Sequence, residues 1–172
     1  MSSTPSIIEI TSAEQSDISD SEISHLLTEV YVEGGFTSSE DAVSLFDPRE
    51  VRKRGIIICA RESENSILAG MIVLVPPNSP ALRIAKGNEA ELHLLAVASK
   101  HRRQGIGRLL VNAAIEAADE LICSKLILWT QISMESAQRI YESCGFVYVG
   151  DMSKNGREFK IYDREIDARS HV

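Results

Sequence analysis

The segment from Glu89 to Leu121 constrains the fold more than any other part of the chain. It begins with an apolar stretch that has polar residues at alternate positions, as in a strand. It continues through the basic stretch Lys100–Arg108 and ends in apolar residues spaced three and four apart, as on one face of a helix. The first backbone N–H groups of a helix have no hydrogen-bond partner within the helix, and the helix dipole gives them partial positive charge. The segment therefore predicts an anion site, and phosphate is the anion that we expect.

Glycines and charge in the same loop strengthen this prediction. Gly105 and Gly107 have no side chain, so an anion can approach the backbone closely. The chain has 18 basic and 25 acidic residues and a net charge of −7, yet residues 100–108 contain four basic residues and no acid. A charge run alone is more often a solvated loop. The two glycines, the preceding strand and the following helix favour a binding site instead.

Two phosphate-binding motifs can be excluded, and a third fits. A dinucleotide fingerprint needs a third glycine where Leu110 stands, and a nucleotide P-loop needs a Gly-Lys-Ser/Thr ending that the loop lacks. The segment resembles the acyl-CoA-binding motif of the GCN5-related N-acetyltransferase (GNAT) superfamily, Arg/Gln-x-x-Gly-x-Gly/Ala after a strand that ends apolar-Ala-Val. Here Arg102-Arg103-Gln104-Gly105-Ile106-Gly107 follows Leu95-Ala96-Val97.

A second segment resembles the same superfamily. Residues 137–146 match its pattern Ala-x-x-apolar-Tyr-x-x-x-Gly-Phe, and the two motifs occur in the family's order. The resemblance covers residues 89–150 well and the first half only by pattern. It implies an α/β fold in a single N-acetyltransferase domain over residues 1–172, with a mixed, mostly antiparallel central sheet flanked by helices. It also implies that the strand containing Leu95–Val97 splays from the strand Leu126–Thr130.

Local patterns predict the individual elements. We expect Ser21 and Ser133 to cap helices, Arg49–Arg54 to be a charged connector, and Asp151–Arg157 to be a turn. The predicted strands are 6–10, 55–60, 68–75, 91–97, 125–130, 145–150 and 158–166, and the predicted helices begin at 21, 37, 106 and 133.

Composition limits the classes of partner. No apolar run is long enough to span a membrane, and the N-terminus lacks a secretory pattern, so we expect a cytoplasmic protein. The acidic balance argues against nucleic acid as a partner. Cys59, Cys123 and Cys144 show no metal-ligand spacing, so we expect no metal and reduced, structural thiols. The resemblance allows a homodimer, for which the sequence holds no signal.

The resemblance also implies which residues hold acetyl-CoA. The backbone of Leu95, Ala96 and Val97 would pair with the pantetheine arm. The family often has Asn where Met134 stands here, so one contact to this arm would be lost or would move to Ser133 or Ser136. The residues implied for the pyrophosphate are Arg102, Arg103, Gln104, Gly105, Ile106, Gly107 and Arg108.

A general base is expected on the strand before the loop. Strand alternation places Glu89, Glu91 and His93 on one face, with Leu92 and Leu94 on the other. The sequence Ala90-Glu91-Leu92-His93-Leu94-Leu95-Ala96-Val97 resembles the histone-acetyltransferase branch, in which the glutamate is the base. Glu91 is therefore our first choice, acting through water, and His93 and Glu89 are the reserves.

The general acid is implied at Tyr141, which aligns with the family tyrosine beside the CoA sulfur. The sequence thus predicts an acetyl-CoA-dependent N-acetyltransferase that acts on a small-molecule or peptide amine. The alternative is a non-catalytic acyl-CoA-binding regulatory module, and the retained Glu91 and Tyr141 favour the enzyme. By resemblance, the regions Tyr31–Phe36 and Asp151–Arg157 border the acceptor pocket, but nothing in them identifies the acceptor.

Overall fold

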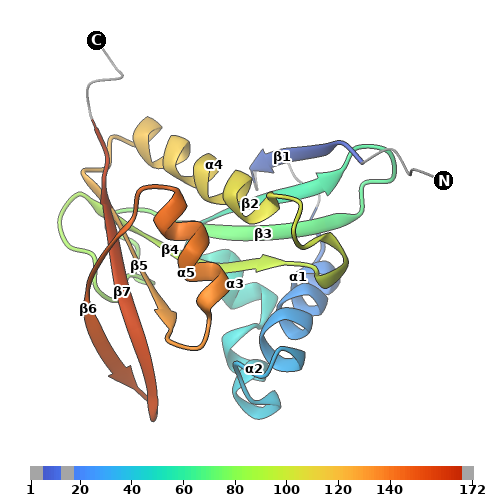
Figure 1. Cartoon of the computed structure of the whole chain (residues 1–172), viewed down its shortest axis with the longest axis horizontal. Helices are drawn as coiled ribbons and strands as arrows, with labels where there is room; N and C mark the ends of the chain where they lie inside the picture. Colours follow the sequence, from blue (N-terminus) through green and yellow to red (C-terminus); the bar gives the residue numbers. More distant parts are fainter. Residues whose placement is uncertain (1–5, 13–17, 168–172) are drawn as a thin grey trace.

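The computed structural model describes residues 6–12 and 18–167; the other residues, including most of the stretch used for the signal prediction, lie outside the description. The seven strands of the described part form one sheet in the order β1-β2-β3-β4-β5-β7-β6 (Figure 1). Only β4 and β5 are parallel, which confirms the predicted mixed, mostly antiparallel sheet. The strands are β1 (Ile8–Ser12), β2 (Ile56–Glu62), β3 (Leu68–Val75), β4 (Glu89–Val97), β5 (Lys125–Gln131), β6 (Val147–Lys154) and β7 (Arg157–Glu165).

Helices cover both faces of this sheet (Figure 1). They are α1 (Asp20–Leu27), the π-helical η1 (Thr28–Glu33), α2 (Ser39–Leu45), α3 (Pro48–Arg54), the 3-10 turn η2 (Ser99–His101), α4 (Ile106–Glu120) and α5 (Glu135–Ser143). None of the helices in the described ranges combines the length and apolar content that crossing a bilayer requires.

Central strand β3 separates two hydrophobic cores. Its residues Ile72 and Leu74 pack in the core that includes α4, whereas Met71, Val73 and Val75 pack in the core that includes α1 and α3. A strand buried on both faces shows a nearly continuous apolar sequence, and this explains why β3 lacks alternation. The two cores hold the sheet rigidly between its helices.

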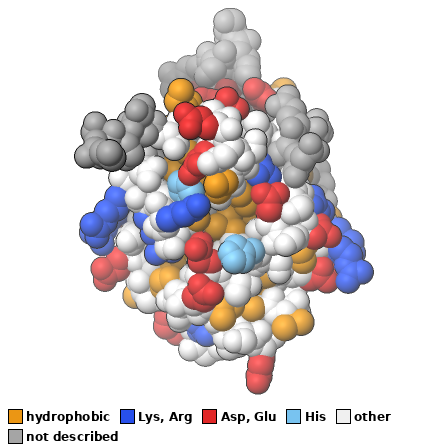
Figure 2. Space-filling model, turned by 90° about the vertical axis from the view of Figure 1, so that its right-hand side faces the viewer, with side chains coloured by type: hydrophobic (Ala, Val, Ile, Leu, Met, Phe, Trp, Pro, Cys, Tyr) orange, Lys and Arg blue, Asp and Glu red, His pale blue; other side chains and the backbone are white. Residues whose placement is uncertain are grey.

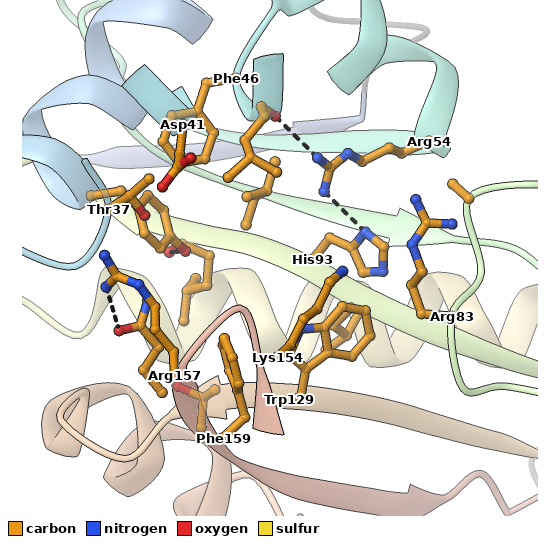
Figure 3. Close-up of a pocket in the computed structure, with 18 of the residues that line it drawn as sticks. Thr37, Asp41, Phe46, Arg54, Arg83, His93, Trp129, Lys154, Arg157 and Phe159 are labelled. Carbon is orange, nitrogen blue, oxygen red and sulfur yellow. Dashed lines mark hydrogen bonds between the residues drawn. The ribbon is translucent and has the colours of Figure 1, made fainter. Parts of the chain in front are cut away.

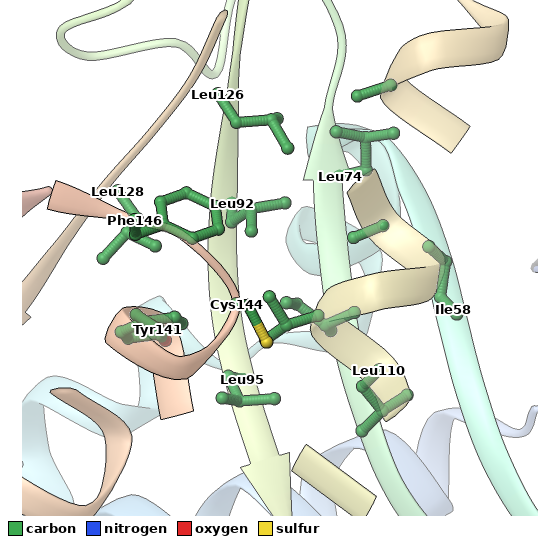
Figure 4. Close-up of a cluster of buried hydrophobic side chains, with 14 of the residues drawn as sticks. Ile58, Leu74, Leu92, Leu95, Leu110, Leu126, Leu128, Tyr141, Cys144 and Phe146 are labelled. Atoms are coloured by element: carbon green, nitrogen blue, oxygen red, sulfur yellow. The ribbon is translucent and has the colours of Figure 1, made fainter. Parts of the chain in front are cut away.

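Helix α5 extends the first core toward the C-terminal hairpin. Figure 4 shows Cys144 and Phe146 beside Leu92 and Leu95 of β4. All three cysteines of the chain are buried, and none forms a disulfide. The prediction of structural thiols agrees with this packing.

The pairing of β4 with β5 is short. It joins Glu89–Glu91 to Lys125–Ile127 and then stops. Beyond this point β4 remains paired with β3, and β5 remains paired with β7. The predicted splay is therefore present, and it leaves one edge of β4 without a neighbouring strand.

A bulge in β4 changes the predicted alternation. Leu94 has a φ of +56°, and the register with β3 shifts opposite it. As a result Leu94 packs with the α1 and α3 core, on the face of His93, while Leu95 packs with Leu92 on the other face. The prediction that Leu92 and Leu94 share a face was wrong, because one extra residue at a bulge reverses the parity beyond it.

Two helix starts differ from the predictions. The cap of α1 is Ser19 rather than Ser21, in a reciprocal capping box with Glu22 whose two hydrogen bonds measure 3.0 and 3.1 Å. Helix α5 begins after Met134 with no side-chain cap, so Ser133 does not cap it.

The predicted connector Arg49–Arg54 and the predicted turn Asp151–Arg157 were also wrong. Pro48 is the first residue of α3, and the Asp47 carboxylate accepts the Arg49 N–H at 2.9 Å. Proline is favourable at a first helical position because it needs no N–H partner there. The turn contains only Asn155 and Gly156, with φ of +51° and +74°, and strands continue on both sides. Asn-Gly is the strongest two-residue hairpin signal.

Candidate active site

The basic loop between β4 and α4 presents unpartnered backbone amides. Gly105 has a φ of +75° and precedes α4 without any side-chain cap. The first amide to bond back along the helix is that of Leu109, to the Gly105 carbonyl at 3.1 Å. The three N–H groups between these residues are the free groups of a helix start. No atom lies within 4 Å of the position where a Cβ on Gly105 would stand, so this backbone is open to a ligand.

The arginines of the loop are available to an anion. Arg102, Arg103 and Arg108 are exposed, and none forms an ion pair within the described part of the chain. Figure 2 shows the end of the molecule where this loop lies, with basic, acidic and hydrophobic side chains interspersed. The loop is thus a local positive site on a mixed surface.

The loop is attached to the sheet through His101. Its imidazole is buried and forms a hydrogen bond with the carboxylate of Glu62 at the end of β2. This hydrogen bond lowers the pKa of Glu62 below its ordinary value, with help from Asn65. The pair fixes where the loop leaves β4.

Gly107 has a different role from Gly105. A Cβ at Gly107 would stand 2.7 Å from Cδ1 of Ile140 in α5. The missing side chain therefore allows α4 and α5 to pack closely. Arg108, next in sequence, donates from Nε to Ser143 Oγ at 3.2 Å and adds a second link between these helices.

A pocket of about 690 Å³ begins where β4 and β5 diverge. Its walls come from β4, β5, the segment 31–54, the loop after β3 and the β6–β7 hairpin. Figure 3 shows His93 and Trp129 within it, and their rings lie 4.9 Å apart. The predicted border regions, Tyr31–Phe36 and Asp151–Arg157, both contribute lining residues.

Two tyrosines stand near the splayed edge. The hydroxyl of Tyr31 donates to the carbonyl of Leu95 at 2.8 Å. Tyr141 lines the pocket, and its hydroxyl has no hydrogen-bond partner among the described residues. Burial raises the pKa of Tyr141 far above its ordinary value, and the nearby Tyr31 adds to the shift. Tyr141 is therefore protonated at neutral pH.

Glu91 is completely buried behind His93. Its carboxylate accepts the N–H of Arg83 at 2.6 and 2.9 Å and the N–H of Ile84 at 3.0 Å. Burial opposes its ionisation, but the neighbouring His93 and the hydrogen bonds from these amides outweigh burial and lower the pKa of Glu91. The carboxylate thus fixes the loop after β3, and its role as a base stays a prediction.

His93 lies between Glu91 and the pocket. Arg54 Nη1 is 3.3 Å from His93 Nδ1, and because arginine only donates, Nδ1 is the acceptor. The proton is then on Nε2, which lies 3.6 Å from Glu91 Oε2. Burial lowers the pKa of His93 below its ordinary value, the Arg54 charge adds to this, and Glu91 opposes it. His93 is therefore a neutral imidazole at pH 7.

The other predicted residues are divided between the loop and the splayed edge. Gln104 is exposed in the loop and Ile106 is buried beneath it. Ser136 is exposed in the first turn of α5, next to Met134, which lines the pocket. Leu95, Ala96 and Val97 lie on the β4 edge beyond its pairing with β5.

Sequence reasoning missed much of the pocket lining, including Arg54, Arg83 and Trp129. Arg54 was assigned to a connector, and Arg83 lies in a loop whose structure the sequence did not predict. Trp129 was read only as part of a buried strand. The described ranges hold no group of three or more His, Cys, Asp or Glu side chains that could hold a metal ion.

The fold, the amide-lined loop and the pocket at a strand splay define an acetyltransferase-type architecture. The sequence profile of the Acetyltransferase (GNAT) family matches residues 21–146. The chain belongs to this family, as the resemblance predicted.

Similar proteins of known name share only part of this chain. N-alpha-acetyltransferase 30 of Xenopus laevis is 43% identical over 75 residues, which are 44% of this chain and 25% of that protein. Human N-acetyltransferase 8 is 36% identical over 98 residues, which are 57% of this chain and 41% of that protein. The match spans less than half of the length of either relative.

Solved structures share the fold across the whole chain. The ribosomal-protein-S18-alanine N-acetyltransferase of Escherichia coli has a TM-score of 0.67 and 21% identity, covering 93% of this chain and 94% of its own. A structure from Salmonella typhimurium with its cofactor acetyl-CoA has a TM-score of 0.67 and 16% identity, covering 94% and 95%. At these identities the likeness shows the fold alone.

Proposed function

We propose that this chain is an acetyl-CoA-dependent N-acetyltransferase that moves the acetyl group to a primary amine. The observation that supports this most directly is the splay of β4 from β5. It leaves a strand edge with the amide-lined loop at one end and the pocket at the other. A long ligand with a diphosphate and a reactive acyl end matches such a site, and family membership supports the same conclusion.

Acetyl-CoA would be held by backbone and side-chain contacts. The free amides after Gly105 and the exposed arginines suit a diphosphate, because helix-start N–H groups and guanidinium groups both favour anions. The unpaired edge at Leu95–Val97 offers strand-like hydrogen bonds to an amide-containing arm. Ser136 is the further candidate for a contact to this arm, since Met134 cannot donate one.

The transfer needs one bond to form and one to break. The amine nitrogen attacks the thioester carbon, the carbon–sulfur bond breaks, and the departing thiolate takes a proton. Tyr141 is assigned as the donor of that proton, because its hydroxyl lines the pocket, has no other partner among the described residues, and is protonated at neutral pH.

The proton of the attacking amine is assigned to the His93–Glu91 pair. Glu91 was the first choice from sequence, but it is buried behind His93 and its lowered pKa makes it a weak base alone. His93 faces the pocket as a neutral imidazole, and the carboxylate 3.6 Å from its Nε2 stabilises the protonated ring. The amine's proton would go, directly or through a water molecule, to Nδ1, the ring nitrogen without a hydrogen, and the 3.3 Å contact from Arg54 to Nδ1 would open as it arrives.

Calorimetric titration and thiol release together test the proposal. The chain is expected to bind acetyl-CoA and CoA and not ATP, and to release CoA thiol when an acceptor amine is added. Binding of acetyl-CoA without thiol release from any amine would favour a non-catalytic regulatory module. Binding of ATP with no binding of acetyl-CoA would contradict both functions.

A further inference from the structure

Four basic side chains line the pocket without a carboxylate partner among the described residues: Arg54, Arg83, Lys154 and Arg157. The pocket's fifth basic residue, Lys53, is paired with Glu50 at 2.9 Å. Unpaired cations are common on this chain, since Arg102, Arg103 and Arg108 also form no ion pair among the described residues. The feature that suggests a binding function is that four of them line one pocket.

Three of these cations gather on one side of the pocket. Figure 3 shows Arg54, Arg83 and Lys154 on the side of His93, and Arg157 on the opposite side near Thr37. The three come from α3, from the loop after β3 and from the end of β6. We call these three residues the basic cluster.

Arg157 does not belong to this cluster, because it lies on the opposite side of the pocket. It donates to the carbonyl of Phe36, and its Nη1 lies 3.3 Å from Gln131 Oε1. Asp41, the other acidic residue of the lining, is exposed on the far side and accepts a hydrogen bond from Ser38 at 2.8 Å. It is not positioned to neutralise the basic cluster.

The members of the basic cluster differ in burial and in partners. Arg54 is half-buried and is held by the Leu45 carbonyl at 3.0 Å and by His93 Nδ1 at 3.3 Å. Burial lowers the pKa of Arg54, the charge of Arg83 lowers it further, and Tyr31 and Glu50 oppose the shift. Arg83 and Lys154 are exposed, so both can reach an anion that enters the pocket beside Arg54.

We infer that the acceptor amine also bears a carboxylate, and that the basic cluster binds this carboxylate while the amine faces the thioester. The inference rests on the proposed function and specifies its substrate class. Two sources supply this chemistry, namely a free amino acid, and a peptide whose first residue is aspartate or glutamate. Arginine recognises carboxylates through paired N–H groups, and Arg54 and Arg83 retain unused donors for this purpose. A polyamine would be repelled.

Matched pairs of amines that differ only in one carboxylate test the inference. The full chain is assayed by thiol release with glycine against glycinamide, glutamate against glutamine, and peptides that begin with Asp against peptides that begin with Asn. The carboxylate member of at least one pair is expected to have the higher kcat/KM by about tenfold, corresponding to one charge-assisted contact. The pair that responds identifies the source. Spermidine is expected to be a poor acceptor.

Two variants locate the selectivity in the basic cluster. Arg83→Gln and Lys154→Gln are each expected to reduce the preference about threefold to tenfold with acetyl-CoA affinity unchanged. Lys53→Gln is the matched control, because it removes a lining charge that Glu50 already pairs, and it should keep the full preference. Rising salt should reduce the preference of the wild-type chain.

The outcomes separate this inference from the proposed function. Suppose that acetyl-CoA binds, but that no carboxylate-bearing amine is acetylated better than its amide and none binds the CoA-loaded chain better. The inference is then wrong, and the proposed function stands. A preference that survives in both cluster variants would also overturn it. If acetyl-CoA does not bind, the proposed function itself fails.

Discussion

Replacing Glu91 by glutamine should destabilise the fold, because this carboxylate is a buried acceptor for the loop after β3. Three contacts shorter than 3.1 Å join its oxygens to the amides of Arg83 and Ile84. A glutamine has one acceptor oxygen, so its NH2 group must face either a loop amide or the Nε2–H of His93. Hydrogen bonds to a charged group contribute about 1.5–3 kcal/mol, against about 1 kcal/mol for neutral ones.

We expect Glu91→Gln to lower the free energy of unfolding by about 2–3 kcal/mol at pH 7, or the Tm by about 4–12 °C. The deficit should depend on pH. The pKa of Glu91 is lowered in the folded chain from an ordinary value of 4.5, so its charge contributes fully above that value. The wild-type advantage should therefore persist from pH 7 down to about 5 and shrink as the pH falls through the folded pKa.

Urea unfolding followed by the fluorescence of Trp129, the one tryptophan of the chain, measures this effect between pH 3.5 and 8. Glu89→Gln on the same strand is the control, since Glu89 accepts only the Lys86 N–H at 3.0 Å near the surface, and it should cost less than about 1 kcal/mol. Unchanged stability in Glu91→Gln, or a deficit equal at pH 4 and pH 7, would refute the reasoning. A loss of kcat without any loss of stability would instead favour a purely chemical role.

Two further substitutions examine the acid and the helix packing. Tyr141→Phe should lower kcat by about 10²-fold or more, because general acid–base contributions are of this size, while the Kd for acetyl-CoA changes little. Steady-state kinetics measures kcat and calorimetry measures the Kd. An unchanged kcat would show that Tyr141 is not the general acid. Gly107→Ala should change the free energy of unfolding by less than about 1 kcal/mol, because the atom 2.7 Å from the new Cβ is the flexible end of the Ile140 side chain and alanine favours the helix. Urea unfolding measures this, and a much larger loss would show that Ile140 cannot move aside.

Local sequence signals predicted the parts of the fold that depend on short-range physics. The basic loop, α4 and the hairpin of β2 with β3 follow from periodicity and glycine placement, so their bounds were close to those found. The Asn155-Gly156 turn and the capping box at Ser19 were equally local, and they could have been predicted from their dipeptide and tetrapeptide patterns.

Other features depend on contacts between distant segments and could not be predicted in the same way. The bulge at Leu94 has no glycine or proline to indicate it, yet it reverses which leucines reach each core. Glu91 alternates like a surface residue, and only the returning loop at Arg83 buries it. The basic cluster forms because three separate segments end at one pocket wall, which no pattern within a single segment records.

The most direct test of the account is the affinity of acetyl-CoA for two glycine variants. Gly105 and Gly87 both have positive φ, of +75° and +60°, and open space where a Cβ would stand, so valine causes similar backbone strain at each. Titration calorimetry should show that Gly105→Val weakens acetyl-CoA binding by tenfold or more, about 1.4 kcal/mol or above, while Gly87→Val binds like the wild type. Equal affinity in Gly105→Val and the wild type would contradict the claim that the amides after Gly105 bind the diphosphate.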